Sequence, residues 1–132
     1  MNRRMIPLIA VLLAALQTSC KTGLKVYMIN NTGQDITVVS VNPGMEDAAT
    51  PIEPGALAEF RVPQKLKVIE KGVTWNYEPR PVPSKFEKRH GAFYRQVFQI
   101  ERDGAIYLVP PQRKKPAAEL PDQPRDFPLR PK

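Results

Sequence analysis

Between residues 24 and 109, short runs of apolar and β-branched residues alternate with polar residues and are separated by turn residues. Alternation with a period of two is typical of β-strands, and no stretch of this region predicts a long helix. We expect strands at residues 24–29, 36–41, 56–62, 66–69, 73–77, 96–102 and 105–109. Such closely spaced strands predict an all-β fold, either a small antiparallel β-sandwich or an open barrel of about seven strands.

The residues between these runs predict how the strands connect. Residues 31–34, 71–72 and 103–104 each join two runs and contain glycine, which accepts the positive φ of a tight turn. We therefore expect three hairpins at these positions. Residues 54–55, proline and glycine, match the central positions of a type II turn. Residues 42–51 are polar and contain proline and glycine, so we expect a loop there.

Residues 78–95 break the strand pattern and carry cations interleaved with aromatic residues, which predicts a basic-aromatic loop. In such a loop the cations would contact an anionic lipid or glycan, and the rings would lie at the interface. The alternative is a solvated loop whose aromatic side chains pack beneath it. The candidate residues for an anionic ligand are Lys85, Phe86, Lys88, Arg89, His90, Phe93 and Arg95.

Residues 110–132 contain seven prolines, so we expect a disordered, proline-rich tail that extends from the domain as an arm. Prolines at P-x-x-P spacing and one phenylalanine offer anchors for the groove of an envelope protein partner. The alternative is an extension with no dedicated partner. The candidate partner-binding residues are Pro121, Pro124, Phe127, Pro128 and Pro131.

The first residues of the chain predict an export signal, because Arg3 and Arg4 precede 12 mostly apolar residues and a short small-residue stretch that ends at Cys20. The apolar stretch is shorter than the roughly 20 residues that span a bilayer. The position of this single cysteine resembles the lipobox of bacterial lipoprotein precursors.

That resemblance implies that residues 1–19 are removed and that acyl chains such as palmitate are attached to Cys20. Residues 20–23 then form a lipidated linker, residues 24–109 the β-sandwich domain and residues 110–132 the tail. The expected location is the cell envelope, at the periplasmic face of the outer membrane if the host is Gram-negative.

The chain is basic, with a formal net charge of +7, which falls by two to +5 when Arg3 and Arg4 leave with the signal. For an exported protein, the anionic partners are lipid headgroups, lipopolysaccharide phosphates and cell-wall polymers, so we expect no nucleic-acid partner. Ser40 and Ser84, the serines after the signal, lie in no catalytic motif, and His90 is the sole histidine. We therefore expect no enzyme activity, no metal and no cofactor.

Three functions fit these predictions. The first is a noncatalytic, membrane-anchored lipoprotein that acts as a binding or structural subunit of a cell-envelope assembly. The second is a carrier or sensor of an anionic lipid or glycan, bound through the basic-aromatic residues. The third is a periplasmic inhibitor or immunity lipoprotein, for which the sequence offers no specific residue.

Overall fold

The computed structural model describes residues 23–132, and this part of the chain is all-β, as predicted. Nine strands form two mostly antiparallel sheets, and one short 3-10 helix, η2 (Ser84–Phe86), precedes the strand β8. No helix within residues 23–132 is long and apolar enough to cross a membrane. The predicted signal and Cys20 lie outside the described residues.

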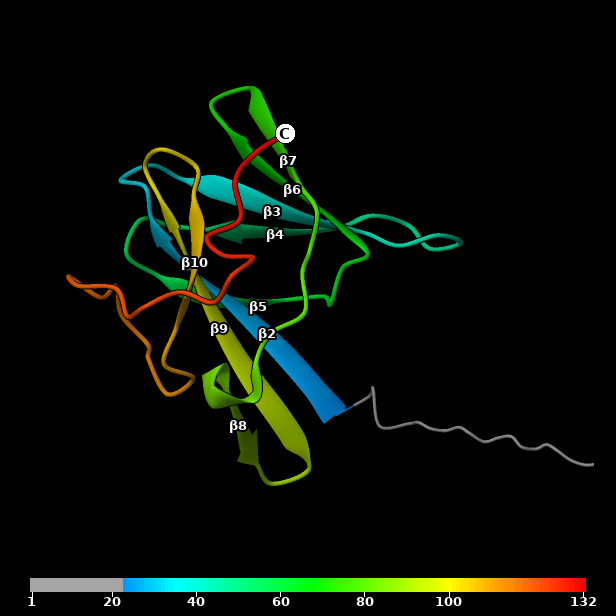
Figure 1. Ribbon diagram of the computed structural model, residues 1–132. Helices are drawn as coiled ribbons and strands as arrows, with labels where there is room; N and C mark the ends of the chain where they lie inside the picture. Colours follow the sequence, from blue (N-terminus) through cyan, green and yellow to red (C-terminus); the bar gives the residue numbers. More distant parts are fainter. Residues whose placement is uncertain (1–22) are drawn as a thin grey trace, which may run out of the picture.

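The two sheets have five and four strands. The first sheet contains, in order, β10 (Ile106–Val109), β9 (Phe93–Glu101), β2 (Leu24–Asn31) and β5 (Leu57–Phe60), with β8 (Glu87–His90) also paired to β9. The second sheet contains, in order, β4 (Ala48–Ile52), β3 (Ile36–Val41), β6 (Lys65–Glu70) and β7 (Val73–Tyr77). Strands β2 and β9 run parallel, and the other paired strands of the described chain run antiparallel (Figure 1).

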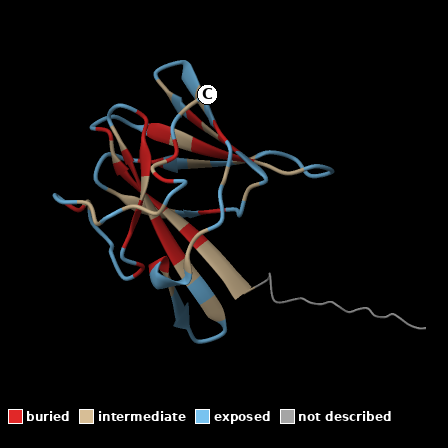
Figure 2. Ribbon diagram, viewed as in Figure 1, coloured by how far each residue is buried: buried red, intermediate tan, exposed pale blue. Residues whose placement is uncertain are grey.

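The two sheets enclose one hydrophobic core in a sandwich-like arrangement. Val26 and Met28 point inward from β2, and Val38 and Val68 point inward from the second sheet, because alternate residues of a strand face the same side. Ile100 of β9 joins them, and all five side chains are at most 3% exposed. Buried positions gather along the strands of both sheets, whereas β8 and the hairpin tips are exposed (Figure 2).

One of the three predicted hairpins is wrong, because β2 and β3 belong to different sheets. The buried side chain of Asn30 shapes this crossover. Its Oδ1 accepts hydrogen bonds from the backbone N–H (3.0 Å) and the hydroxyl (2.7 Å) of Thr32. Its Nδ2 donates to the carbonyl oxygens of Gln34 (2.6 Å) and Ile52 (2.9 Å). These bonds satisfy the polar groups of the turn, so the chain leaves the first sheet and does not fold back along β2.

The other predicted turns are confirmed. Strand β6 pairs with β7 across Lys71 and Gly72, whose φ angles of 48° and 78° match a type I′ turn. Strand β9 pairs with β10 across residues 103–104. At residues 54–55, the N–H of Ala56 donates to the carbonyl oxygen of Glu53 at 3.1 Å, which closes the expected turn.

Two strands, β4 and β8, lie where the sequence predicted loops. Strand β4 contains Pro51 and small residues, and β8 is wholly polar, so neither shows the apolar alternation that indicates a strand. Both lie at sheet edges, where proline and charged residues are tolerated because one side of the strand needs no partner. The expected count of about seven strands is therefore too low.

Residues 110–132 pack against the sheets, so the prediction of a disordered arm is wrong. The buried residues of this segment include Ala117, Phe127 and Leu129. Leu120 packs against a second, smaller apolar cluster on the outer face of the first sheet. That cluster contains Ile29, Val97 and Val109. The proline-rich segment is therefore a covering layer over this face (Figure 1).

Two glutamine side chains hold the proline-rich segment to the sheet. The amide of Gln99 accepts a hydrogen bond from the N–H of Ala117 (2.8 Å) and donates to its carbonyl oxygen (3.2 Å). The amide of Gln123 likewise accepts from the N–H of Leu108 (2.8 Å) and donates to its carbonyl oxygen (2.9 Å). Because a side-chain amide has the same donor and acceptor as a peptide group, it replaces a neighbouring strand.

The end of the proline-rich segment covers the free edge of β10 and reaches the second sheet. Leu129 and Ile106 exchange two backbone hydrogen bonds of 2.8 and 2.9 Å. The N–H of Lys132 donates to the carbonyl oxygen of Asn76 in β7 at 2.9 Å. Unpaired sheet edges favour association with other chains, so this cover removes one such edge.

Candidate functional site

The predicted basic-aromatic residues lie mainly on β8 and β9, at the end of the first sheet where β2 begins (Figure 1). Lys88 of β8 lies opposite Arg95 of β9, and His90 lies opposite Phe93. On the other side of β9, Lys25 of β2 lies beside Arg95. Directly opposed residues project to the same face of a sheet, so Lys25, Arg95 and Lys88 form a basic row across three strands.

Aromatic rings on the same face contact two cations of the basic row. The Nζ of Lys25 lies 4.0 Å from the ring centroid of Phe93. The guanidinium carbon of Arg95 lies 4.0 Å from the ring centroid of Tyr27 in β2. Each such cation–π contact stabilises by about 0.5–2 kcal/mol, depending on how far it is desolvated. The rings therefore fix the orientation of cations that would otherwise move freely.

The remaining predicted residues of this group lie elsewhere. Phe86 is buried in the main core, as the packed alternative predicts, and the Nζ of Lys85 lies 5.4 Å from its ring centroid. Arg89 projects to the face opposite Lys88, because it is the next residue of the strand. Its Nη1 donates to the hydroxyl of Tyr94 at 3.3 Å. The structure therefore divides the predicted site between two faces and the core.

The basic row continues into a cavity of about 290 Å³ between β8, β9 and the proline-rich segment. This basic cavity is lined by Lys88, His90, Arg95, Pro111, Gln112 and Lys114. Four of the six residues have basic side chains, and none is an acid. Gln112 and Lys114 were not among the predicted site residues, because we expected their segment to extend away from the domain.

Arg95 is the most constrained cation of the basic cavity. Its Nε donates to the carbonyl oxygen of Pro111 at 2.6 Å, and its guanidinium carbon lies over the ring of Tyr27. Its Nη2 is buried and has no hydrogen-bond partner within residues 23–132. A buried donor without a partner costs about 1–3 kcal/mol, and more when the group is charged. The fold therefore holds a guanidinium whose hydrogen-bonding capacity is only partly used.

Within residues 23–132, the cations of the basic cavity also lack an acidic partner within 4.0 Å. Within the described chain, the ion pairs are Arg130 with Asp103 (3.7 Å) and Lys132 with Glu78 (2.6 Å). Both pairs involve the last residues of the proline-rich segment and neither lines the basic cavity. Like charges on neighbouring strands repel, so the basic cavity favours a negative ligand.

Tyr77 and Glu78, whose pKa values are shifted, lie outside the basic cavity. Burial is the main cause that raises the pKa of Tyr77, whose hydroxyl donates to the carbonyl oxygen of Gly104 at 2.6 Å. The hydrogen bond from Lys132 is the main cause that lowers the pKa of Glu78. Both groups join the second sheet to distant segments, which is a structural role.

The predicted partner-binding residues of the tail lie against the domain and not on an extended arm. Phe127 is buried, and its ring centroid lies 6.4 Å from that of Phe98. Pro131 packs close to Gly104, at the turn between β9 and β10. Pro121 lines a cavity beside β8, and Pro124 and Pro128 are half-buried. The arm that we expected to bind a partner is therefore part of the fold.

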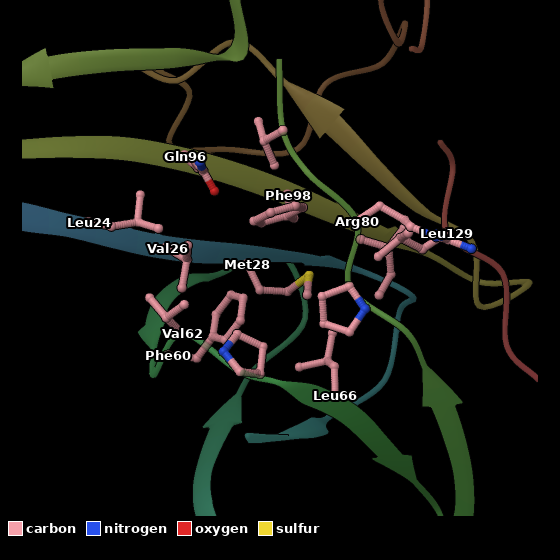
Figure 3. A pocket seen from close by; sticks show the side chains of 14 residues that line it. Leu24, Val26, Met28, Phe60, Val62, Leu66, Arg80, Gln96, Phe98 and Leu129 are labelled. Atoms are coloured by element: carbon pink, nitrogen blue, oxygen red, sulfur yellow. The ribbon is translucent and has the colours of Figure 1, made fainter. Parts of the chain in front are cut away.

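A second, apolar cavity of about 190 Å³ lies between the two sheets (Figure 3). Val26, Met28 and Phe98 point into it from the first sheet, and Leu66 points into it from the second. Its polar lining residues are Arg80 and Gln96. The side-chain amide of Gln96 already donates to Glu87 at 2.6 Å. This cavity therefore presents hydrocarbon surface and offers little chemistry.

The residues considered for catalysis are not assembled into one site. The hydroxyl of Ser40 is buried and donates to the carbonyl oxygen of Arg61 at 2.6 Å. Ser84 belongs to η2, and His90 lies exposed on β8. Within residues 23–132, no group of three or more His, Cys, Asp or Glu residues is placed to hold a metal ion.

Comparisons with known proteins give no relative from which a function can be transferred. No protein-family model, no curated protein and no solved structure matches this chain. Its function is therefore argued from the geometry and charge of the basic end of the first sheet.

Proposed function

We propose that this protein is a noncatalytic binding protein of the bacterial cell envelope. Acyl chains on Cys20 tether it to a membrane, and the basic end of the first sheet binds an anionic envelope component. The single observation that carries the proposal is the basic row, Lys25, Arg95 and Lys88, which lies on one face without acidic partners in the described chain.

The position of the basic row also supports the membrane tether. Leu24 lies beside Tyr94 at the start of the parallel pair β2–β9, next to the basic row. Cys20 precedes Leu24 by four residues, which span at most about 14 Å when fully extended. A membrane that holds acyl chains on Cys20 therefore lies within reach of these cations, where anionic headgroups attract lysine and arginine.

The other proposed functions gain less support. The packing of residues 110–132 against the sheets argues against a structural subunit that recruits its partner through a free arm. An inhibitor or immunity role is favoured by no specific residue. In a Gram-negative host, the proposed location is the periplasmic face of the outer membrane.

The tether is tested by expressing the full chain and its Cys20→Ala variant in a Gram-negative host. Intact mass should show acyl chains on the wild-type protein, which should sediment with the outer membrane. The variant should lack this mass and leave the membrane fraction. Equal membrane association of both proteins, without acyl mass, would contradict the tether.

The anionic contact is tested separately with the Cys20→Ala full chain and vesicles. Vesicles that contain phosphatidylglycerol should bind the protein, and vesicles of phosphatidylcholine should not. Binding should fall steeply with salt, because the Debye length is about 10 Å at 0.1 M ionic strength. Lys88→Ala should weaken binding, whereas Lys67→Ala, on the second sheet, is the matched control. Binding that is independent of salt would contradict the proposal.

A further inference from the structure

We infer that the basic cavity is a specific site for a phosphate group, with Arg95 as its central residue. This inference rests on the proposed function, because it names the chemistry of the ligand at the same basic end. Its basis is an arginine that is held rigidly, incompletely hydrogen-bonded and surrounded by other basic side chains.

The first argument is the geometry of Arg95. Its Nε donates to the carbonyl oxygen of Pro111, and its guanidinium carbon lies over the ring of Tyr27. The terminal nitrogens remain, and Nη2 has no partner in the described chain. A planar guanidinium binds phosphate through two parallel hydrogen bonds, and a fixed plane loses little entropy on binding. Arg95 lines the basic cavity, so an oxyanion there meets the guanidinium, and it pairs with the covered Nη2 when the neighbouring side chains shift.

The second argument is the charge around Arg95. Lys88 lies on the adjacent strand directly opposite, where strands are about 4.8 Å apart. His90 and Lys114 line the same cavity from β8 and from the proline-rich segment. Such a convergence of cations is unfavourable in the empty site and becomes favourable when an anion lies between them.

The third argument is a comparison with cations elsewhere in the same segment. Arg130 and Lys132, near its end, each lie within 4.0 Å of a carboxylate. Lys114, near its beginning, lines the basic cavity, which has no acidic residue. Within the described chain, the cations at the end of the segment are thus paired, whereas Lys114 and its neighbours Arg113 and Lys115 form no ion pair. The missing negative charge at Lys114 is what a ligand would provide.

The fourth argument selects phosphate among anions. A phosphate monoester carries a charge of about −1.5 to −2 at pH 7, which matches several cations better than one carboxylate does. Gln112 adds an amide at the rim, and Pro111 is the one apolar residue of the lining. The basic residues of the lining therefore suit a multiply charged anion. The source of the phosphate is either a lipid headgroup or a free phosphate.

The experiment uses the full chain with Cys20→Ala, titrated with inorganic phosphate against chloride at equal ionic strength. Thermal denaturation and NMR amide shifts report binding, because a ligand of the native state raises the unfolding midpoint. Arg95→Lys keeps the charge but loses the planar fork, and Lys114→Ala removes an exposed cation without touching the core. Each should weaken phosphate binding at least tenfold.

The matched control is Arg89→Gln. Arg89 also contacts a tyrosine ring, and it lies on β8 next to Lys88, but it faces away from the basic cavity. This variant should bind phosphate within about twofold of the parent. If Arg89→Gln weakens binding as much as Lys114→Ala does, the attraction is nonspecific and the site is refuted.

The outcomes separate this inference from the proposed function. Phosphate binding that depends on Arg95 and Lys114, without vesicle binding, supports the site for free phosphate and removes the membrane contact. Vesicle binding that Arg95→Lys and Lys114→Ala leave unchanged supports the proposed function and overturns the site. No response to phosphate above the chloride control also overturns it, and water then satisfies Nη2 of Arg95.

Discussion

The outer faces of the two sheets are built differently. The outer face of the first sheet carries Ile29, Val97 and Val109, which are fully buried beneath residues 110–132. The outer face of the second sheet carries Ile69, which is 37% exposed. The difference shows that the proline-rich segment is a structural layer for the outer face of the first sheet.

This difference follows from the sequences of the strands. The first sheet contains the parallel pair β2–β9, and parallel strands are stable mainly when both faces are buried. Strand β2 accordingly has an apolar run from Val26 to Ile29 without alternation. Strand β6 alternates, with Leu66 and Val68 inward and Lys65 and Lys67 outward. A sheet with apolar residues on both faces needs another segment over its outer face. Residues 110–132 pack there even though they contain seven prolines.

Deletion of residues 110–132 should give the largest effect. It exposes the outer cluster of the first sheet and removes Phe127 and Leu129 from the main core. Each of these large-to-small losses costs about 2–5 kcal/mol, so the deletion should cost at least 5 kcal/mol, which is about the whole stability of a small domain. Circular dichroism and urea denaturation should show an unfolded chain. A cooperative transition at the wild-type midpoint would show that the cover is dispensable.

The next largest difference is expected between point substitutions in the proline-rich segment and on the outer face of the second sheet, measured as the loss of free energy of unfolding. Phe127→Ala should destabilise the protein by about 3–5 kcal/mol, because the ring is 7% exposed and packs against Phe98. Ile69→Ala, on the open face of the second sheet, should cost about 1 kcal/mol or less. The measurement is the urea midpoint of each variant. Equal losses of stability in the two variants would mean that the outer face of the second sheet is also covered in solution.

The sequence predicted the hairpins best where local turn chemistry determines the pairing. Lys71 with Gly72 joins neighbours of one sheet, and the antiparallel partners follow directly. The turn at residues 31–34 has similar local chemistry, yet the side chain of Asn30 redirects the chain through bonds to Gln34 and Ile52. One of these partners is 22 residues away, so no local pattern reports it.

The candidate site was only partly predicted, because long-range contacts that leave no local pattern also assemble it. The cations at 85–95 were identified from composition, but their division between two faces follows from β8 pairing with β9, and a wholly polar strand gives no such signal. Lys25 and Tyr27 joined the site through a parallel pairing across about 70 residues of sequence. Lys114 joined it because the proline-rich segment returns to the sheet. One feature of the sequence could have predicted this return. The residues of β2 are apolar on both faces of the sheet, so another segment must cover the outer face.

Loss of one glutamine bridge should produce a smaller effect than loss of a buried ring. Gln99→Ala leaves the N–H and carbonyl of Ala117 without their partner, which should cost about 1–3 kcal/mol. Gln112→Ala, in the same segment but exposed, should change stability by about 0.5 kcal/mol or less. Hydrogen exchange at Ala117 should accelerate in the first variant alone. Unchanged protection there would show that apolar contacts hold the segment without the bridge.

The smallest effect concerns the end of the proline-rich segment, where Lys132 donates to Glu78 at 2.6 Å. This bond lowers the pKa of Glu78 below its ordinary value of 4.5, so the folded state favours the ionised carboxylate. The contact therefore stabilises the fold above pH 4.5 and is lost as the pH falls through the lowered pKa. NMR signals of Lys132 should move in that acid range, while those of Ala117 stay fixed. In Glu78→Gln the movement should vanish, and its persistence would assign the titration to another carboxylate.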